Sequence, residues 1–92
     1  MTFIYPAIFT PHKEDNGYHA EFPDLAFCEV DGPDLEDTIE LAKEAAYDWL
    51  SLELEEQDYD FPAQTHIEDI ILGEGCLAKS LMITIKLMPD ND

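Results

Sequence analysis

The stretch that most constrains this fold is GPDLEDTIELAKEAAYDWLSLELEEQ, residues 32–57, which has the periodicity of one long helix. Asp34 stands where an N-cap is needed, and Glu36 and Asp37 suit the positive end of a helix dipole. Apolar residues recur at helical spacing, which places them on one face: Leu35, Ile39, Ala42, Ala46, Trp49 and Leu50. The sequence therefore predicts a helix that begins after Asp34, with one apolar face and acidic residues on its other faces.

Segments with the alternation of β-strands lie on both sides of this helix. Residues 2–10, 18–22 and 27–30 precede it, and residues 78–88 follow it with one set of apolar residues on one face: Leu81, Ile83, Ile85 and Leu87. We therefore predict an α+β fold in the order β-β-β-α-β, with a four-stranded mixed sheet and the long helix on one face. In this prediction the helix is a right-handed crossover that brings the last strand parallel to the first.

The other face of the predicted sheet has no cover within the chain. Apolar residues such as Ile4 and Ile8 fall on it. An exposed apolar surface of this kind is typical of self-association or of a partner protein. We therefore expect a homo-oligomer, a dimer or a tetramer, formed through the uncovered face or through an edge strand.

The net charge of the chain limits the classes of molecule that it can bind. The 92 residues include 4 basic and 22 acidic side chains, which gives a net charge of -18. A field of that sign repels phosphate backbones and anionic lipid, so we expect no direct contact with nucleic acid or membrane, whereas a basic protein is attracted. The chain shows no signal peptide, no apolar run approaching ~20 residues and no disulfide framework. The expected location is the cytoplasm.

The residues that carry chemistry do not predict catalysis. A metal-dependent nuclease needs converging carboxylates, and in so acidic a chain chance proximity is expected among the candidates Glu21, Asp24, Glu29 and Glu40. His12, His19 and His66 lack the spacing of a zinc site, and Cys28 sits in an apolar run where a cysteine behaves as a core residue. We expect no enzyme, no metal site and no cofactor, and we expect His12 and His19 to face each other across a hairpin.

Several segments together resemble the HicB-like antitoxin domain of type II toxin–antitoxin systems. They are a first strand YPAIF, the run GYHAEFPDL, a nearby cysteine and, after a glycine, the acidic helix LEDTIELAKEAAYDWL. The pattern G-Y-x-x-x-F-P-D-L, Gly17 to Leu25, is the most specific part. The likeness runs from Ile4 to Leu50 and continues weakly over residues 67–87. The resemblance implies a partial ribonuclease H-like fold without the nuclease carboxylate set.

The resemblance also implies a partner, a small basic HicA-type toxin that cleaves RNA and is neutralised by occlusion of its active site. A charge of -18 suits that partner, because complementary charge speeds association. Two alternatives stay open: a stand-alone oligomeric HicB-like binding domain without a toxin and, least favoured, a ribonuclease H-like metal-dependent nuclease. We place the toxin contact on a turn with an exposed Leu25 and on the acidic helix face, at Glu21, Phe22, Asp24, Leu25, Glu36, Glu40, Glu44 and Asp48.

The sequence departs from the family pattern at two places. Ala26-Phe27 stands where the family commonly has Pro-Gly, which predicts a less tight turn, and Gly32-Pro33-Asp34 replaces a Gly-Asp-Thr type of helix start. Family members often add a C-terminal segment that binds operator DNA, whereas this sequence ends at MPDND. We therefore expect residues 1–92 to form a single HicB-like domain without a C-terminal DNA-binding segment.

Overall fold

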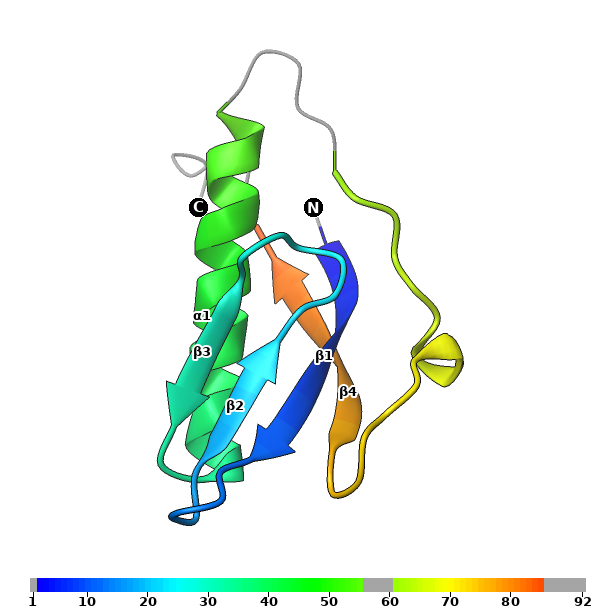
Figure 1. Ribbon diagram of the computed structural model, residues 1–92. Helices are drawn as coiled ribbons and strands as arrows, with labels where there is room; N and C mark the ends of the chain where they lie inside the picture. The colour runs from blue at the N-terminus through cyan, green and yellow to red at the C-terminus, as the bar shows by residue number, and fades with distance from the viewer. Residues whose placement is uncertain (1, 56–60, 86–92) are drawn as a thin grey trace.

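The computed structural model describes residues 2–55 and 61–85 (Figure 1). One sheet and one long helix dominate the fold. In chain order the elements are β1 (Thr2–Pro11), β2 (Tyr18–Glu21), β3 (Glu29–Gly32), α1 (Leu35–Leu54), the short 3-10 helix η1 (Ile67–Asp69) and β4 (Leu77–Thr84). The strands lie in the order β3-β2-β1-β4, and α1 packs on one face of the sheet. The predicted α+β class and the order of the main elements are confirmed.

The predicted direction of the last strand is wrong. Thr2 pairs with Thr84 and Phe9 pairs with Leu77, so β4 runs antiparallel to β1. The other two neighbouring pairs are also antiparallel, and the sheet is therefore not mixed. The physical reason is that α1 is only part of the connection. Residues 61–76 run back along the sheet before β4 begins, and this second pass reverses the direction in which β4 enters (Figure 1).

The helix begins as predicted. The Asp34 side chain accepts a hydrogen bond of 2.8 Å from the backbone N–H of Asp37, which caps one of the free donors of the first turn. The buried Thr38 hydroxyl donates to the Asp34 carbonyl. Gly32 lies so close to Thr38 that a Cβ atom there would collide with the Thr38 side chain and backbone. The end of β3 and the start of α1 are therefore fixed by direct contact.

The core lies between α1 and the sheet. Alternate residues of β1 face α1, and the helix contributes Ala42, Ala46 and Leu50, as its predicted apolar face requires. Leu81, Ile83 and Ile85 are buried as predicted, while Leu87 lies outside the described residues. The remaining buried apolar residues are Phe3, Tyr5, Ala7, Phe9, Ala20, Phe22, Leu25 and Cys28.

A segment that we call the strap, residues 61–72, partly covers the face of the sheet opposite α1. The first strap residues contact side chains of the inner face of β1: the Tyr5 hydroxyl donates a 2.6 Å hydrogen bond to the Pro62 carbonyl, and the Phe61 and Phe3 rings lie 4.7 Å apart. Strap residues and the side chain of Pro6 line a common hollow, and Pro6 is buried. The expectation of a fully uncovered face is therefore wrong in part.

Some apolar surface remains on this outer face. Ile4 and its register partner Met82 are exposed, whereas Ile8 is only half-buried. In the part of the chain that the structure describes, no helix is both long enough and apolar enough to cross a membrane.

Candidate protein-binding site

The loop between β2 and β3, residues 22–28, is a compact turn. The Phe22 N–H donates to the Cys28 carbonyl (3.1 Å), the Leu25 N–H donates to the Phe22 carbonyl (3.2 Å), and the Cys28 N–H donates to the Leu25 carbonyl (3.1 Å). These bonds turn the three side chains toward the core. They also delay the start of β3 to Glu29, two residues later than the sequence predicts.

Leu25 is only 1% exposed and Phe22 is also buried. The expectation of an exposed Leu25 is wrong, because the loop closes over the end of the core and Leu25 fills that end. Neither side chain offers a partner much surface. The GYHAEFPDL run is thus specific to the fold of the loop, and its two apolar members are packing residues.

Phe27 is the exposed aromatic residue of this loop. Its side chain is 96% exposed and its backbone adopts a φ of 62°, which is the left-handed region that favours glycine. The turn therefore keeps the conformation that a glycine would adopt, and the expected loosening at Ala26-Phe27 does not occur. Sequence reasoning did not single out Phe27, although its place at a glycine position of the family pattern was the available signal.

The loop is attached to α1. The Trp49 indole N–H donates a 2.9 Å hydrogen bond to the Ala26 carbonyl, next to Phe27. On the other side, the Asp24 carboxylate accepts two hydrogen bonds from Thr65 of the strap, 2.8 Å from its backbone N–H and 2.5 Å from its hydroxyl. Asp24 is therefore engaged within the chain, and Phe27 is displayed from a loop held on both sides.

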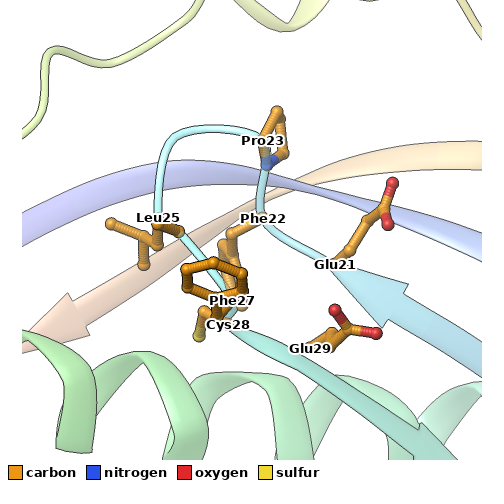
Figure 2. Close-up of a pocket in the computed structure, with 8 residues that line it drawn as sticks. Glu21, Phe22, Pro23, Leu25, Phe27, Cys28 and Glu29 are labelled. Atoms are coloured by element: carbon orange, nitrogen blue, oxygen red, sulfur yellow. The ribbon is translucent and has the colours of Figure 1, made fainter.

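A hollow of about 230 Å³ lies at this loop (Figure 2). Glu21 and Glu29 are register partners on β2 and β3, so their carboxylates lie at the same side of the hollow. Burial raises the pKa of the Cys28 thiol to about 11, so the thiol stays neutral and Cys28 behaves as the predicted core residue. The hollow thus combines the exposed ring of Phe27, the carboxylates of Glu21 and Glu29, and the buried, unreactive side chains of Phe22, Leu25 and Cys28.

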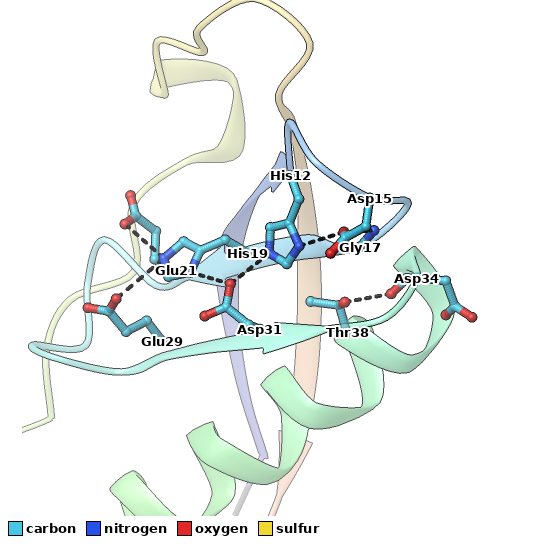
Figure 3. Close-up of polar contacts among 9 residues, drawn as sticks. All are labelled: His12, Asp15, Gly17, His19, Glu21, Glu29, Asp31, Asp34 and Thr38. Carbon is cyan, nitrogen blue, oxygen red and sulfur yellow. Dashed lines mark hydrogen bonds and ion pairs between the residues drawn. The ribbon is translucent and has the colours of Figure 1, made fainter.

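A histidine–carboxylate cluster continues from these carboxylates along the outer face (Figure 3). His12 Nε2 lies 2.8 Å and His19 Nδ1 lies 3.2 Å from the same Asp31 oxygen, so the two histidines meet as predicted. His12 Nδ1 lies 2.9 Å from Asp15. His19 Nε2 lies 3.4 Å from Glu29, at the edge of the hollow. Among residues 2–55 and 61–85, no group of three or more His, Cys, Asp or Glu side chains has the arrangement of a metal site.

The cluster predicts a pH dependence of stability. Hydrogen bonds first to Asp31 and then to Asp15 raise the pKa of His12, and the bond with His12 lowers the pKa of Asp31. The contribution of His12 to the stability of the fold is full below its ordinary pKa of 6.5 and is lost as pH rises through the raised pKa. The contribution of Asp31 to stability is present above pH 3.8, its ordinary pKa, and is lost as pH falls through the lowered pKa.

We therefore expect His12→Gln to destabilise the domain most between about pH 4 and 6.5 and progressively less above that range. The measurement is the midpoint of thermal unfolding of both proteins as a function of pH. His66→Gln, the same substitution at an exposed strap residue, controls for the change of side chain. A His12→Gln effect that grows toward alkaline pH would contradict the raised pKa of His12.

The predicted acidic face of α1 is present and exposed. Glu36, Glu40, Glu44 and Asp48 all point away from the sheet, and Glu40 has Lys43 Nζ at 3.9 Å. They extend over about 18 Å of helix, since each residue rises 1.5 Å. Asp48 lies in the half of α1 that contains Trp49, whose indole is bonded to the β2–β3 loop, whereas Glu36 lies at the other end of α1. Of the sequence-predicted residues, Glu21, Phe22 and Leu25 line the hollow, and none of the four helix carboxylates does.

The four carboxylates proposed for a nuclease do not all converge: Glu21 and Glu29 are register partners on neighbouring strands, and the other two lie elsewhere. Glu21 projects from the outer face of the sheet, while Glu40 projects from the solvent side of α1, which covers the inner face. Asp24 is bonded to Thr65. An arrangement with carboxylates on opposite sides of the domain cannot bind one pair of metal ions. The geometry is that of a small protein-binding domain.

Comparison with known proteins agrees with this class. The family model described as HicB_like antitoxin of bacterial toxin-antitoxin system matches residues 5–87. The fold is therefore that of an antitoxin domain. The chain belongs to the HicB-like antitoxin family of bacterial toxin–antitoxin systems. No curated protein matches it.

Three solved structures share the fold. A toxin–antitoxin complex from Streptococcus pneumoniae has a TM-score of 0.75 at 16% identity, with 91% of this chain and 70% of that chain covered. The N-terminal domain of Burkholderia pseudomallei antitoxin HicB has a TM-score of 0.69 at 19% identity, with 92% of this chain and 100% of that chain covered. A HicA3 and HicB3 toxin–antitoxin complex has a TM-score of 0.65 at 21% identity, with 91% of this chain and 99% of that chain covered. At such identities the likeness concerns the fold.

Proposed function

We propose that this chain binds and neutralises a small basic HicA-like toxin that cleaves RNA, by occluding the active site of the toxin. The observation that carries the proposal is the family match over residues 5–87. Two of the similar structures are described as toxin–antitoxin complexes. A net charge of -18 supports the same partner, because an RNA-binding surface is basic and an acidic domain competes with RNA phosphates for it.

The proposal includes the setting of the domain. Residues 1–92 act as a single HicB-like domain in the cytoplasm, without direct contact to DNA or membrane. The domain forms a homo-oligomer, a dimer or a tetramer. Its toxin-binding surface consists of the β2–β3 loop and the acidic face of α1. Of the sequence-predicted set, Glu21, Phe22 and Leu25 line the hollow, and Phe22 and Leu25 are buried.

Co-expression tests the proposal directly. A small basic protein encoded beside this chain should arrest growth when expressed alone, and expression of this chain should restore growth. The two proteins should purify as one complex, and the complex should not cleave RNA that the free toxin cleaves. Failure of this chain to bind or to protect against any adjacent basic protein would overturn the proposed function.

Charge reversal on α1 tests the surface. The double substitution Glu44→Lys and Asp48→Lys is expected to slow association with the basic toxin on the order of threefold to tenfold and to flatten its salt dependence, because rim charges act mainly on the association rate. Stopped-flow or surface plasmon resonance at several salt concentrations measures both effects.

The matched control changes the same charge elsewhere. Glu14 and Glu74 are exposed, and the hairpin and the turn that carry them lie at the opposite end of the sheet from the β2–β3 loop (Figure 1). Glu14→Lys with Glu74→Lys is expected to have a smaller effect at low salt. Equal effects from both pairs would mean that net charge alone, and not this face of α1, governs association.

A second function has one observation in its favour. Ile4 and Met82 are paired, exposed and uncharged on the outer face of β1 and β4, a surface suited to a second copy of an acidic chain. In that case the chain is a stand-alone oligomeric HicB-like domain without a toxin. Light scattering on Met82→Lys distinguishes the two functions, since loss of the oligomer with no basic partner to bind favours the second.

A further inference from the structure

We propose that the hollow at the β2–β3 loop receives a cationic side chain, lysine or arginine, of the toxin, and that Phe27 is the anchor of this contact. The proposal rests on the proposed function and names the site and the chemistry through which it operates. The sequence-based site contains Glu21 but not Phe27, and two of its other loop members, Phe22 and Leu25, are buried. Phe27 therefore takes the place that Leu25 was expected to hold.

Two unfavourable features coincide at Phe27. Among the residues that the structure describes, it is the one non-glycine residue with a positive φ, and its side chain is almost fully exposed. A left-handed backbone disfavours any residue with a Cβ, and an exposed aromatic ring gains nothing from burial. Neither feature stabilises the isolated domain. Once a partner covers the ring, its burial becomes favourable and offsets the cost of the left-handed backbone.

The loop holds Phe27 in one position before a partner arrives. The flanking Ala26 carbonyl accepts the Trp49 hydrogen bond, and the Cys28 N–H and carbonyl both take part in bonds within the loop. Little conformational freedom remains to be lost on binding, and preorganised loops bind more tightly for that reason. Central aromatic residues on such supports carry a large share of the energy in many protein interfaces.

The chemistry around the ring selects a cation. Glu21 and Glu29 lie directly opposite each other on neighbouring strands, and like charges in that arrangement repel. His19 Nε2 lies 3.9 Å from Glu21 and 3.4 Å from Glu29, and even a protonated His19 leaves a net negative charge on this group. A positive charge in the hollow relieves this repulsion and also interacts favourably with the face of an aromatic ring. A second copy of this chain, with its net charge of -18, would add more negative charge. The occupant is therefore a basic residue of the toxin.

Substitutions at Phe27 test the proposal by binding and by stability together. Phe27→Gly relieves the left-handed backbone, so its thermal unfolding midpoint should equal or exceed that of the wild type. Its Kd for the adjacent basic toxin, measured by calorimetry, should rise by roughly tenfold or more, as for loss of an aromatic anchor. Phe27→Leu keeps the apolar bulk without the ring and should weaken binding by about threefold, the loss of an exposed cation–π contact.

Ile71→Gly is the matched control, because Ile71 is 95% exposed and lies on the strap outside the hollow. It should leave the Kd unchanged. The proposal is overturned if the wild type binds the toxin and Phe27→Gly binds it equally well, a result that leaves the proposed function intact. It is also overturned if Phe27→Leu binds like the wild type, which makes the occupant apolar, or if Phe27→Gly dissociates an oligomer of this chain without affecting the toxin. No toxin binding by the wild type itself overturns the proposed function.

Discussion

Leu50→Ala is expected to destabilise the domain by about 2–5 kcal/mol, the usual cost of truncating a fully buried leucine. Leu50 is 0% exposed and lies on the face of α1 that packs against the sheet. A loss of this size is a large share of the roughly 5–15 kcal/mol that stabilise a small domain. The measurement is the urea midpoint, with the dependence on urea concentration unchanged if the native state keeps its compactness.

Leu52→Ala provides the control on the same helix. Leu52 lies two residues further along α1 and is 65% exposed. Both variants remove the same atoms, and leucine and alanine are both good helix formers. The exposed variant is expected to stay within about 0.5 kcal/mol of the wild type. Equal losses at the two sites would mean that the inner face of α1 is not where the structure places it.

The second large effect is expected at Gly32. Gly32→Ala places a Cβ atom against the Thr38 hydroxyl. This Cβ would lie 2.9 Å from the Thr38 Cα and 3.0 Å from the Thr38 backbone nitrogen. Backbone atoms of the first turn of α1 cannot move aside as a flexible side chain can. The expected loss is about 1–3 kcal/mol, the range for an overpacked site. Chemical unfolding measures the loss, and far-ultraviolet circular dichroism shows whether α1 itself is retained.

Gly73→Ala is the matched glycine control. A Cβ at Gly73 would have its nearest neighbour, Cys76 Sγ, at an ordinary contact distance of 3.8 Å. Alanine there restricts the unfolded chain, so a small gain or no change is expected. A comparable loss at both glycines would mean that the contact with Thr38 does not explain the Gly32 result.

The parts of the fold that were predicted correctly depend on local sequence. The N-cap at Asp34 and the inner face of α1 follow from residues within a few positions of one another. The inward positions of β4, such as Leu81 and Ile83, follow from alternation with a period of two. These signals require no knowledge of where the rest of the chain lies.

The direction of β4 could not be predicted in the same way. It depends on how residues 61–76 return along the sheet, and the strap has no helical or strand periodicity that shows its course. Its position is fixed by contacts across long separations, including the Tyr5 hydrogen bond to the Pro62 carbonyl and the packing of Phe61 on Phe3. The cover over Pro6 escaped prediction for the same reason.

The candidate site was likewise predicted only where local sequence or composition determines it. Composition alone indicated an acidic surface and a basic partner, and the α1 carboxylates are exposed as the helical pattern requires. Which loop residue faces solvent was decided by backbone geometry. Phe22 and Leu25 turn inward because the loop bonds form between Phe22, Leu25 and Cys28, and the positive φ at Phe27 directs its ring outward. A residue pattern does not specify a dihedral angle.

The contact between Asp24 and Thr65 has a consequence for proteolysis of the domain. It joins residues 41 positions apart, so the loop that presents Phe27 is tethered to a segment remote from it along the chain. A protease that nicked the strap would release this tether while leaving Phe27 itself untouched. Cleavage in the strap would thereby loosen the loop that presents Phe27 before the core had unfolded.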